Sequence, residues 1–215
     1  MTASDAYAGI APVYDASVGP LLRPMYRAVC SVVHAELGDG TRRVLDIGCG
    51  TGALCASLAR IRNGKGELGV TGLDSSGAML RRAAAKTRGS VVYVRGNAAQ
   101  TGFKQASFDI ATICLALHEN KPGVIAGILG EVRRVVRPGG LLVVADHARG
   151  TGLFGKMFSL AALPVERLAG IHHYTMYRRF MREGGVAGCL VRHGFRVDQA
   201  HSLYGGTVAI LLAKW

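Results

Sequence analysis

The sequence predicts an α/β fold in which a parallel sheet is covered by helices on both faces. Short runs rich in apolar and β-branched residues alternate with longer stretches in which apolar residues recur at helical spacing. This alternation is typical of parallel sheets, because a crossover between parallel strands usually contains a helix. The 215 residues, 49% of them hydrophobic, suffice for one core, so we expect a single domain, 1–215.

Seven strands are predicted from these runs. In chain order they are Arg42–Gly48, Leu68–Asp74, Val91–Arg95, Phe108–Leu117, Leu141–Asp146, Phe195–Ser202 and Thr207–Lys214. Tyr204-Gly205-Gly206 between the last two is typical of a hairpin turn, so the sheet is expected to end in an antiparallel pair.

Three crossover helices are predicted between the strands. Their apolar residues run from Leu54 to Ile61, from Met79 to Ala84 and from Val124 to Val136. The third helix is expected to end at Arg137-Pro138-Gly139-Gly140, because proline and glycine do not extend a helix. Ser75 and Ser76 stand where the second helix would be capped, which puts Asp74 at the carboxyl end of its strand.

The composition excludes several classes of protein. Charged residues at 19% and a mean hydropathy of +0.25 exclude a disordered chain. The longest apolar stretches, such as Leu141–Ala145 and Val208–Ala213, are too short to span a bilayer. The N-terminus lacks the features of a secretory signal, so we expect a mature, cytoplasmic chain. Five cysteines without a Cys-x-x-Cys pair indicate reduced thiols rather than disulfides or a zinc site.

The net charge of +12 raises the question of an anionic partner, such as RNA or an anionic membrane. The alternative is that helical arginines form solvated faces. The arginines concerned are Arg81, Arg82, Arg88, Arg133, Arg134 and Arg137. No RNA-binding motif is present, so nucleic acid is not expected, whereas peripheral contact with an anionic membrane stays open. A basic binding module without turnover is therefore one alternative function.

Residues 44–52, Val-Leu-Asp-Ile-Gly-Cys-Gly-Thr-Gly, form a strand that runs into a glycine-rich turn and then a helix. Gly48, Gly50 and Ala53 also satisfy the dinucleotide fingerprint, so an NAD-linked oxidoreductase is a second alternative. Asp46 favours a different cofactor, because its carboxylate would repel a pyrophosphate but suits an ammonium group. S-adenosylmethionine (SAM) carries that ammonium and has no phosphate.

Two further strand ends supply polar groups for the same ligand. Asp74 can accept hydrogen bonds from both hydroxyls of an adenosine ribose. Asn97 fits the edge of an adenine, with an ordinary turn asparagine as the alternative. The predicted cofactor-binding residues are Asp46, Gly48, Cys49, Gly50, Gly52, Asp74, Ser75, Asn97, Ala98, Leu115 and Tyr14.

These segments resemble the motifs of the class I SAM-dependent methyltransferases. Residues 44–52 are similar to the first motif, Gly72–Asp74 to the ribose motif, Arg95–Ala98 to the adenine motif, and Phe108–Asp109 and Glu131–Gly140 to later motifs. The resemblance implies a Rossmann-like, doubly wound sheet of seven strands in the order 3-2-1-4-5-7-6, with only strand 7 antiparallel. It also implies methyl transfer from SAM. The chain departs from the pattern at Asn97, where many relatives have Asp.

Within the family, Tyr7–Asp15 and the Arg-Pro-Gly-Gly turn look most like the quinone-biosynthesis C-methyltransferases and the bacterial phospholipid N-methyltransferases. Both groups act on greasy acceptors, so we expect a small, hydrophobic or lipid/quinone-like acceptor. Leu115–Glu119 does not match the quinone enzymes, which leaves the identity of the acceptor open. No Asn- or Asp-Pro-Pro-Tyr motif follows the fourth strand, which argues against methylation of nucleic-acid amino groups.

His118 and His147 are the predicted catalytic residues, because they follow the fourth and fifth strands and should lie beside the transferred methyl group. Either side chain can contact the acceptor or remove its proton; the alternative is a polar loop histidine. Together with Glu119 and Asp146 they could in principle converge on a metal, but the loop position explains their polarity and no metal is predicted.

Two segments outside the alternation are expected to cover the acceptor pocket. They are a helical N-terminal segment, residues 1–40, and an insertion at 150–188, of which residues 150 to about 184 would move. Within the insertion, an apolar wall is expected from Phe154, Met157, Phe158 and Leu160, and contacts to a polar part of the acceptor from Tyr174, Tyr177, Arg178 and Arg179. The alternative is a helical pair packed permanently on the sheet.

Overall fold

The computed structural model describes residues 15–16, 18–37, 42–63, 66–150 and 171–215. Tyr14 and the expected apolar wall of the insertion lie outside these residues. The strands are β1 (Arg42–Ile47), β2 (Arg62–Asn63), β3 (Gly66–Asp74), β4 (Val92–Arg95), β5 (Phe108–Cys114), β6 (Val136–His147), β7 (Arg196–Leu203) and β8 (Val208–Lys214).

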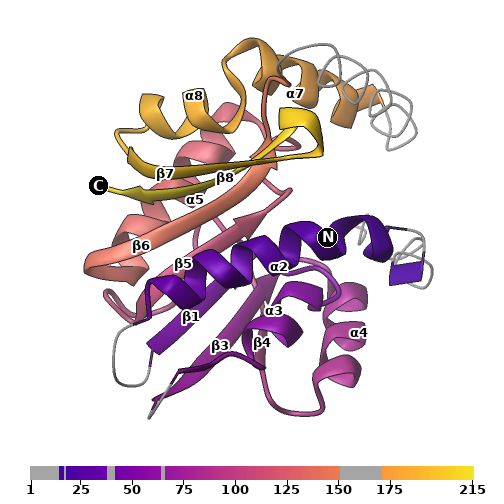
Figure 1. Cartoon of the computed structure of the whole chain (residues 1–215), viewed down its shortest axis with the longest axis vertical. Coiled ribbons are helices and arrows are strands. Elements are labelled where there is room, and N and C mark those ends of the chain that lie inside the picture. Colours follow the sequence, from indigo (N-terminus) through magenta and orange to yellow (C-terminus); the bar gives the residue numbers. More distant parts are fainter. Residues whose placement is uncertain (1–14, 17, 38–41, 64–65, 151–170) are drawn as a thin grey trace.

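The strands form one sheet in the order β4-β3-β1-β5-β6-β8-β7 (Figure 1). Strand β8 is antiparallel to both of its neighbours, and the other pairs along this path are parallel. With the predicted strands numbered along the chain, this order is 3-2-1-4-5-7-6, and the expected topology is confirmed. The hairpin turn is also confirmed, as a short 3-10 segment at Tyr204–Gly206.

Apart from shifts of up to three residues at several strand ends, such as β5 ending at Cys114 rather than Leu117, two details of the sheet differ from the prediction. Strand β2 was not predicted, because two residues that pair antiparallel with β3 leave no periodic pattern. Strand β6 begins at Val136 rather than Leu141, because Val136 already pairs with Phe108 of β5.

The helices are α2 (Gly19–Ala35), α3 (Ala53–Leu58), α4 (Gly77–Thr87), α5 (Pro122–Val135), α7 (Ile171–Arg182) and α8 (Gly185–Arg192). The apolar residues of α2, α3 and α4 pack on one face of the sheet, and those of α5, α7 and α8 pack on the other. In β1, Val44 belongs to the first of these cores and its neighbour Leu45 to the second. Burial on both faces explains why the central strands are continuously apolar.

Helix α2 is part of the first core. Its residues Leu22, Met25 and Val29 are at most 8% exposed and recur at helical spacing. The described part of the N-terminal segment is therefore a packed element of the fold. That the N-terminal segment also covers the acceptor pocket stays a prediction.

Candidate functional site

A glycine-rich loop joins β1 to α3 at the carboxyl edge of the parallel strands. Gly48, Gly50 and Gly52 all have positive φ angles, 71°, 52° and 72°, which glycine adopts at little cost. The backbone N–H groups of Gly48 and Cys49 donate to the carbonyl of Leu73 at 2.8 and 3.0 Å. The end of β3 therefore holds the loop in place.

Gly52 and Gly50 of this loop differ in the space around them. A Cβ at Gly52 would lie 2.8 Å from the Cβ of Ala83, so this glycine is required for packing of α3 against α4. A Cβ at Gly50 would meet no atom of the described residues within 4 Å. Open space in front of Gly50 lets a ligand approach the backbone closely, as the prediction for this loop requires.

Asp74 connects the loop to helix α4. Its carboxylate accepts hydrogen bonds from the backbone N–H of Gly50 and of Ser76, both at 2.8 Å. The Ser76 hydroxyl in turn accepts from Met79 N at 3.1 Å and caps α4, as predicted. Each carboxylate oxygen has a second acceptor position, so Asp74 can also receive the two ribose hydroxyls.

Asp46 lies behind the loop and is 2% exposed. It accepts hydrogen bonds from the Thr112 hydroxyl at 2.7 Å and the Cys55 thiol at 3.1 Å. Burial raises the pKa of Asp46 to about 6, although these two hydrogen bonds act in the opposite direction. Pairing with a ligand ammonium would offset the cost of ionising this buried carboxyl group.

Three further predicted cofactor residues, Asn97, Cys49 and Leu115, differ in their side-chain environments. The side-chain oxygen of Asn97 accepts from Ala99 N at 2.9 Å, as in a turn asparagine, so an adenine would be met by its NH₂ group. Cys49 is 8% exposed, so a ligand would reach its backbone rather than its thiol. Leu115 follows β5 with a φ of 51°, a conformation that costs a non-glycine residue free energy and is frequent at functional sites.

One contact of this site was missed by the sequence analysis. Asp15 accepts a hydrogen bond from the Thr51 hydroxyl at 2.6 Å and pairs with Lys86 of α4 at 2.9 Å. Burial alone would raise the pKa of Asp15, but these two partners outweigh it and lower the pKa. The chain just before α2 is thereby tied to the glycine-rich loop, and only the position of Asp15 in the resembling segment hinted at this.

The two predicted catalytic histidines lie together: His118 follows β5 as expected, whereas His147 is the last residue of β6 rather than a residue beyond it, because it still pairs with Val208 of β8. Their ring centroids are 4.5 Å apart, with an interplanar angle of 88°. His118 is 4% exposed, whereas His147 is partly exposed. The carboxylate of Asp146 accepts hydrogen bonds from the backbone N–H groups of both histidines. Asp146 is fully buried, and its Oδ1 is 2.7 Å from Nδ1 of His118.

Helix α7 packs over this pair. Tyr177 and Phe180 are 5% and 4% exposed, and the Tyr177 ring lies 4.9 Å from that of His147. Arg149 donates to the carbonyls of Met181 and Arg182, at 3.1 and 2.9 Å, and so holds the carboxyl end of α7. This half of the predicted cover is arranged as the packed alternative describes, and its movement stays a prediction.

His118, Asp146 and His147 can each offer one ligand atom, with these atoms within 4.8 Å of one another. No other such group occurs in the described ranges. The Asp146 carboxylate accepts from His118 Nδ1 and from the backbone N–H groups of Leu117, His118 and His147. Because these four donors fill its acceptor positions, the geometry favours Asp146 as an orienting group rather than a metal ligand.

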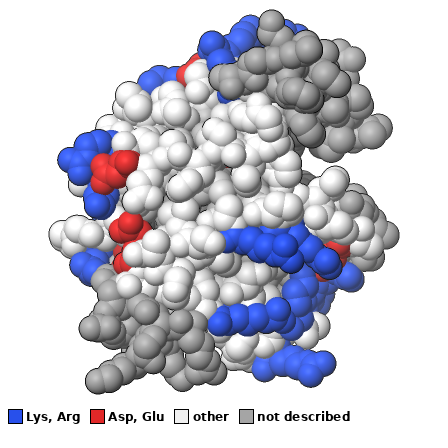
Figure 2. Space-filling model, viewed as in Figure 1, with Lys and Arg blue, Asp and Glu red and all other residues white. Residues whose placement is uncertain are grey.

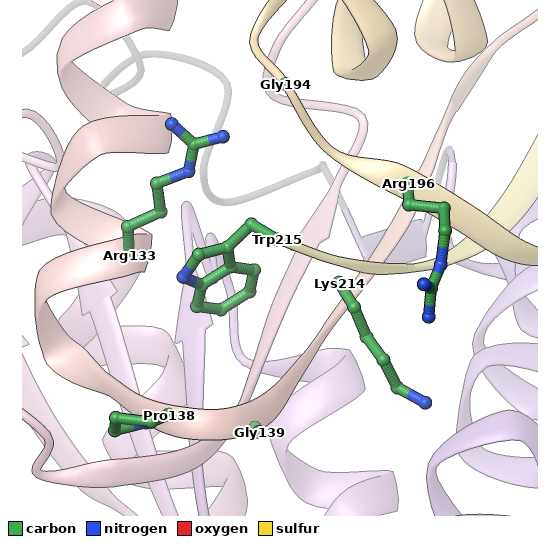
Figure 3. Close-up of a pocket in the computed structure, with 8 residues that line it drawn as sticks. Arg133, Pro138, Gly139, Gly194, Arg196, Lys214 and Trp215 are labelled. Atoms are coloured by element: carbon green, nitrogen blue, oxygen red, sulfur yellow. The ribbon is translucent and has the colours of Figure 1, made fainter.

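A separate hollow of about 500 Å³ lies at the opposite end of the strands (Figure 3). Arg133, Arg196, Lys214 and Trp215 contribute to its lining. Its cations already have partners, since Arg196 and Lys214 share Asp198 and Arg133 lies 4.6 Å from the Phe195 ring centroid. This hollow is not part of the predicted site, because the glycine-rich loop and both histidines lie at the other edge.

Comparison with known proteins also points to a methyltransferase. The family described as "Methyltransferase domain" matches residues 44–140. A demethylmenaquinone methyltransferase of Beutenbergia cavernae is 32% identical over 87% of this chain and 78% of that protein. An uncharacterized methyltransferase of Synechocystis is 28% identical over 80% of this chain and 76% of that protein. The chain therefore belongs to the class I SAM-dependent methyltransferases, and SAM is its methyl donor.

Solved structures agree with this at the level of the fold. DhpI, crystallised with S-adenosylhomocysteine (SAH), has a TM-score of 0.65 and 16% identity, covering 97% of this chain and 92% of that chain. A SAM-dependent methyltransferase structure from Methanococcus maripaludis has a TM-score of 0.64 and 17% identity, covering 100% of this chain and 95% of that chain. The NAD-linked oxidoreductase gains no support from these comparisons. None of the helices in the described residues is long and apolar enough to cross a bilayer.

Proposed function

We propose that this enzyme methylates a small, hydrophobic acceptor of the quinone or lipid type. The observation that carries the proposal is the 32% identity to a demethylmenaquinone methyltransferase over most of both chains. The similarity of Tyr7–Asp15 to enzymes with greasy acceptors supports the same acceptor class.

SAM supplies an electrophilic sulfonium methyl group, so the protein mainly has to hold the two partners in line and exclude water. In our proposal, Asp74 binds the ribose hydroxyls and Asp46 balances the ammonium. Gly50 leaves room for the cofactor beside the loop. His118 and His147 border the acceptor at the neighbouring strand ends.

The proposal is tested by measuring SAH release from SAM. The acceptors are a prenylated 1,4-dihydroxynaphthalene, kept reduced in detergent micelles, and phosphatidylethanolamine in the same micelles. We expect release with the first compound above the rate without acceptor. Release with neither, from an enzyme that binds SAM, would contradict the proposed acceptor class.

A pair of glycine variants gives the matched control. Gly50→Val and Gly139→Val both put a side chain at a positive φ, 52° and 73°, where a Cβ meets no atom within 4 Å in the part of the chain that the structure describes. Gly139 lies at the opposite edge of the sheet, so both variants carry the backbone strain but only Gly50→Val fills the cofactor space. We expect SAM binding and SAH release to be lost in Gly50→Val alone.

A further inference from the structure

Asp146 is held by an unusually complete set of donors. Its Oδ1 accepts from His147 N and His118 Nδ1, both at 2.7 Å. Its Oδ2 accepts from Leu117 N at 2.9 Å and His118 N at 3.3 Å. Burial alone would raise the pKa of Asp146, but its interactions with His118 and with the backbone N–H of His147 outweigh burial and lower the pKa. The carboxylate is therefore ionised and fixed in position.

The fixed carboxylate determines which ring nitrogen of His118 carries the proton. An ionised carboxylate only accepts hydrogen bonds, so Nδ1 of His118 must donate. When the ring is neutral, Nε2, at its other end, then carries the lone pair. This is the arrangement by which a buried carboxylate turns a histidine into a base.

The His118 ring is buried and packs against aromatic side chains of α7. His118 is 4% exposed, and its ring centroid is 5.3 Å from that of His173 and 6.2 Å from that of Tyr177, both on α7. Among the described residues, the titratable side chains whose rings face it are His147 on β6 and His173 and Tyr177 on α7. Glu119, after β5, lies 3.6 Å from His173. Exclusion of water strengthens the interaction between Asp146 and His118.

We propose that Asp146 and His118 form a proton-removing pair, and that the acceptor carries a hydroxyl group whose proton His118 takes. This inference rests on the proposed function and narrows it. A neutral amine is nucleophilic without a base, whereas a hydroxyl group attacks well only after it has lost its proton. The pair would therefore serve hydroxyl acceptors and not the amine of a phospholipid.

The proposed step balances as follows. The acceptor O–H bond breaks, and its proton goes to Nε2 of His118. The electron pair left on the acceptor forms a bond to the methyl carbon, and the carbon–sulfur bond breaks with its pair on sulfur, which leaves SAH. Attack through a conjugated ring carbon ends with loss of that carbon's proton and reprotonation of the oxygen. In both cases one proton leaves His118 for water.

The first test does not depend on activity. Imidazole nitrogen NMR of the histidine-labelled protein, with the His118 signal assigned by its loss in His118→Gln, should show a neutral ring protonated on Nδ1. Asp146→Asn should abolish this fixed form. Asp109→Asn, which also removes a buried carboxylate but at the far end of β5, should leave it unchanged. A His118 ring protonated on Nε2 would overturn the inference, and so would stoichiometric binding of added Zn²⁺ through His118 and His147 at submicromolar Kd.

The second test uses two acceptors of matched shape, 1,4-dihydroxynaphthalene and 1,4-diaminonaphthalene. At pH 7, Asp146→Asn should lower kcat for the hydroxyl compound about 100-fold or more with little change in KM. The deficit should shrink as the pH approaches about 10, where a phenolic hydroxyl ionises unaided. Methyl transfer to the diamine but not to the dihydroxy compound would overturn this inference and leave the methyltransferase function intact. Failure of the protein to bind SAM would instead overturn the methyltransferase function itself.

Discussion

At the residue scale, the Asp74 carboxylate has a structural role and, in our proposal, also binds the cofactor. It fixes the N–H of Gly50 and of Ser76, and in our proposal it also receives the ribose hydroxyls. We predict that Asp74→Ala weakens SAM binding by about 2–3 kcal/mol, which is about 30- to 150-fold in Kd, because two charge-assisted hydrogen bonds are lost. Calorimetry measures this change.

The control for this prediction is Asp198→Ala, which removes a carboxylate that pairs with Arg196 and Lys214 on the surface. It should leave the SAM Kd unchanged. A folded Asp74→Ala protein that binds SAM as tightly as the wild type would remove Asp74 from the cofactor site.

If Asp46 balances the ammonium group of SAM as we propose, its raised pKa should make SAM binding depend on pH. Its pKa of about 6 in the free protein exceeds the ordinary value of 3.8, so the folded state holds this proton more tightly than the unfolded state does. The contribution of Asp46 to stability therefore grows as the pH falls from about 6 to about 4, and it is lost as the pH rises through 6.

Ligand binding should have the opposite dependence, because only the ionised Asp46 can balance an ammonium. We predict that SAM affinity is constant above about pH 7 and falls up to tenfold per pH unit below about 6. Calorimetry from pH 5 to 8 measures it. Asp46→Asn should bind more weakly at pH 7 and show no such slope; a slope that persists in this variant would assign the titration to another group.

At the scale of the elements, the Glu131–Gly140 segment that resembles a family motif proves to connect α5 to the sheet. Glu131 accepts from both N and Oγ1 of Thr101, at 2.9 and 2.7 Å, and pairs with Arg134. A Cβ at Gly140 would lie 2.6 Å from the carbonyl oxygen of Asp109. The motif therefore reflects packing between β5, α5 and β6 rather than chemistry.

We predict that Glu131→Gln lowers the free energy of unfolding by about 1–2 kcal/mol at pH 7, because the Arg134 pair and the Thr101 hydrogen bonds hold the pKa of Glu131 down to about 2. A lowered pKa gives stability that is present above pH 4.5 and lost as the pH falls toward 2. The difference between variant and wild type should thus vanish near pH 2. Urea unfolding measures it, with Glu36→Gln as a control at an exposed contact.

Local sequence patterns were sufficient to predict most elements and their order. The spacing of apolar residues in a strand or helix depends on which of its faces are buried. In this fold both faces of the sheet are buried, so the strands are continuously apolar. The role of α2 was harder to predict, because its apolar stripe is equally compatible with a cover and with a core helix. Its contacts with α3, β6 and β8 decide this, and they join residues far apart in sequence.

In the candidate site, too, some features could be predicted from the sequence and others could not. The rule that parallel strands end at one edge predicted the positions of Gly50, Asp74, His118 and His147. It did not predict that Asp15 reaches Thr51, or that Asp146 turns inward to His118, because these contacts depend on side-chain directions between separate elements.

At the scale of the whole molecule, basic side chains gather on one part of the face shown in Figure 2. Figure 2 shows a band of basic side chains across the part of the surface where Figure 1 places α2. Arg23 and Arg27 are exposed and four residues apart, so they share one side of that helix, while Leu22, Met25 and Val29 are buried. The neighbouring Leu21 is 68% exposed. Basic side chains beside an exposed leucine fit a surface that rests on an anionic membrane.

Such contact would bring the enzyme to the place where a greasy acceptor dissolves. We predict binding to vesicles of 70% phosphatidylcholine and 30% phosphatidylglycerol at low salt, with loss of binding at 0.5 M NaCl because the charges are then screened. The double variant Arg23→Gln and Arg27→Gln should bind about 30-fold more weakly, at about 1 kcal/mol per arginine. The double variant Arg192→Gln and Arg196→Gln removes the same charge from α8 and β7 and should bind as the wild type does. Equal weakening in both double variants, measured by vesicle sedimentation, would mean that total charge and not the α2 surface drives the association.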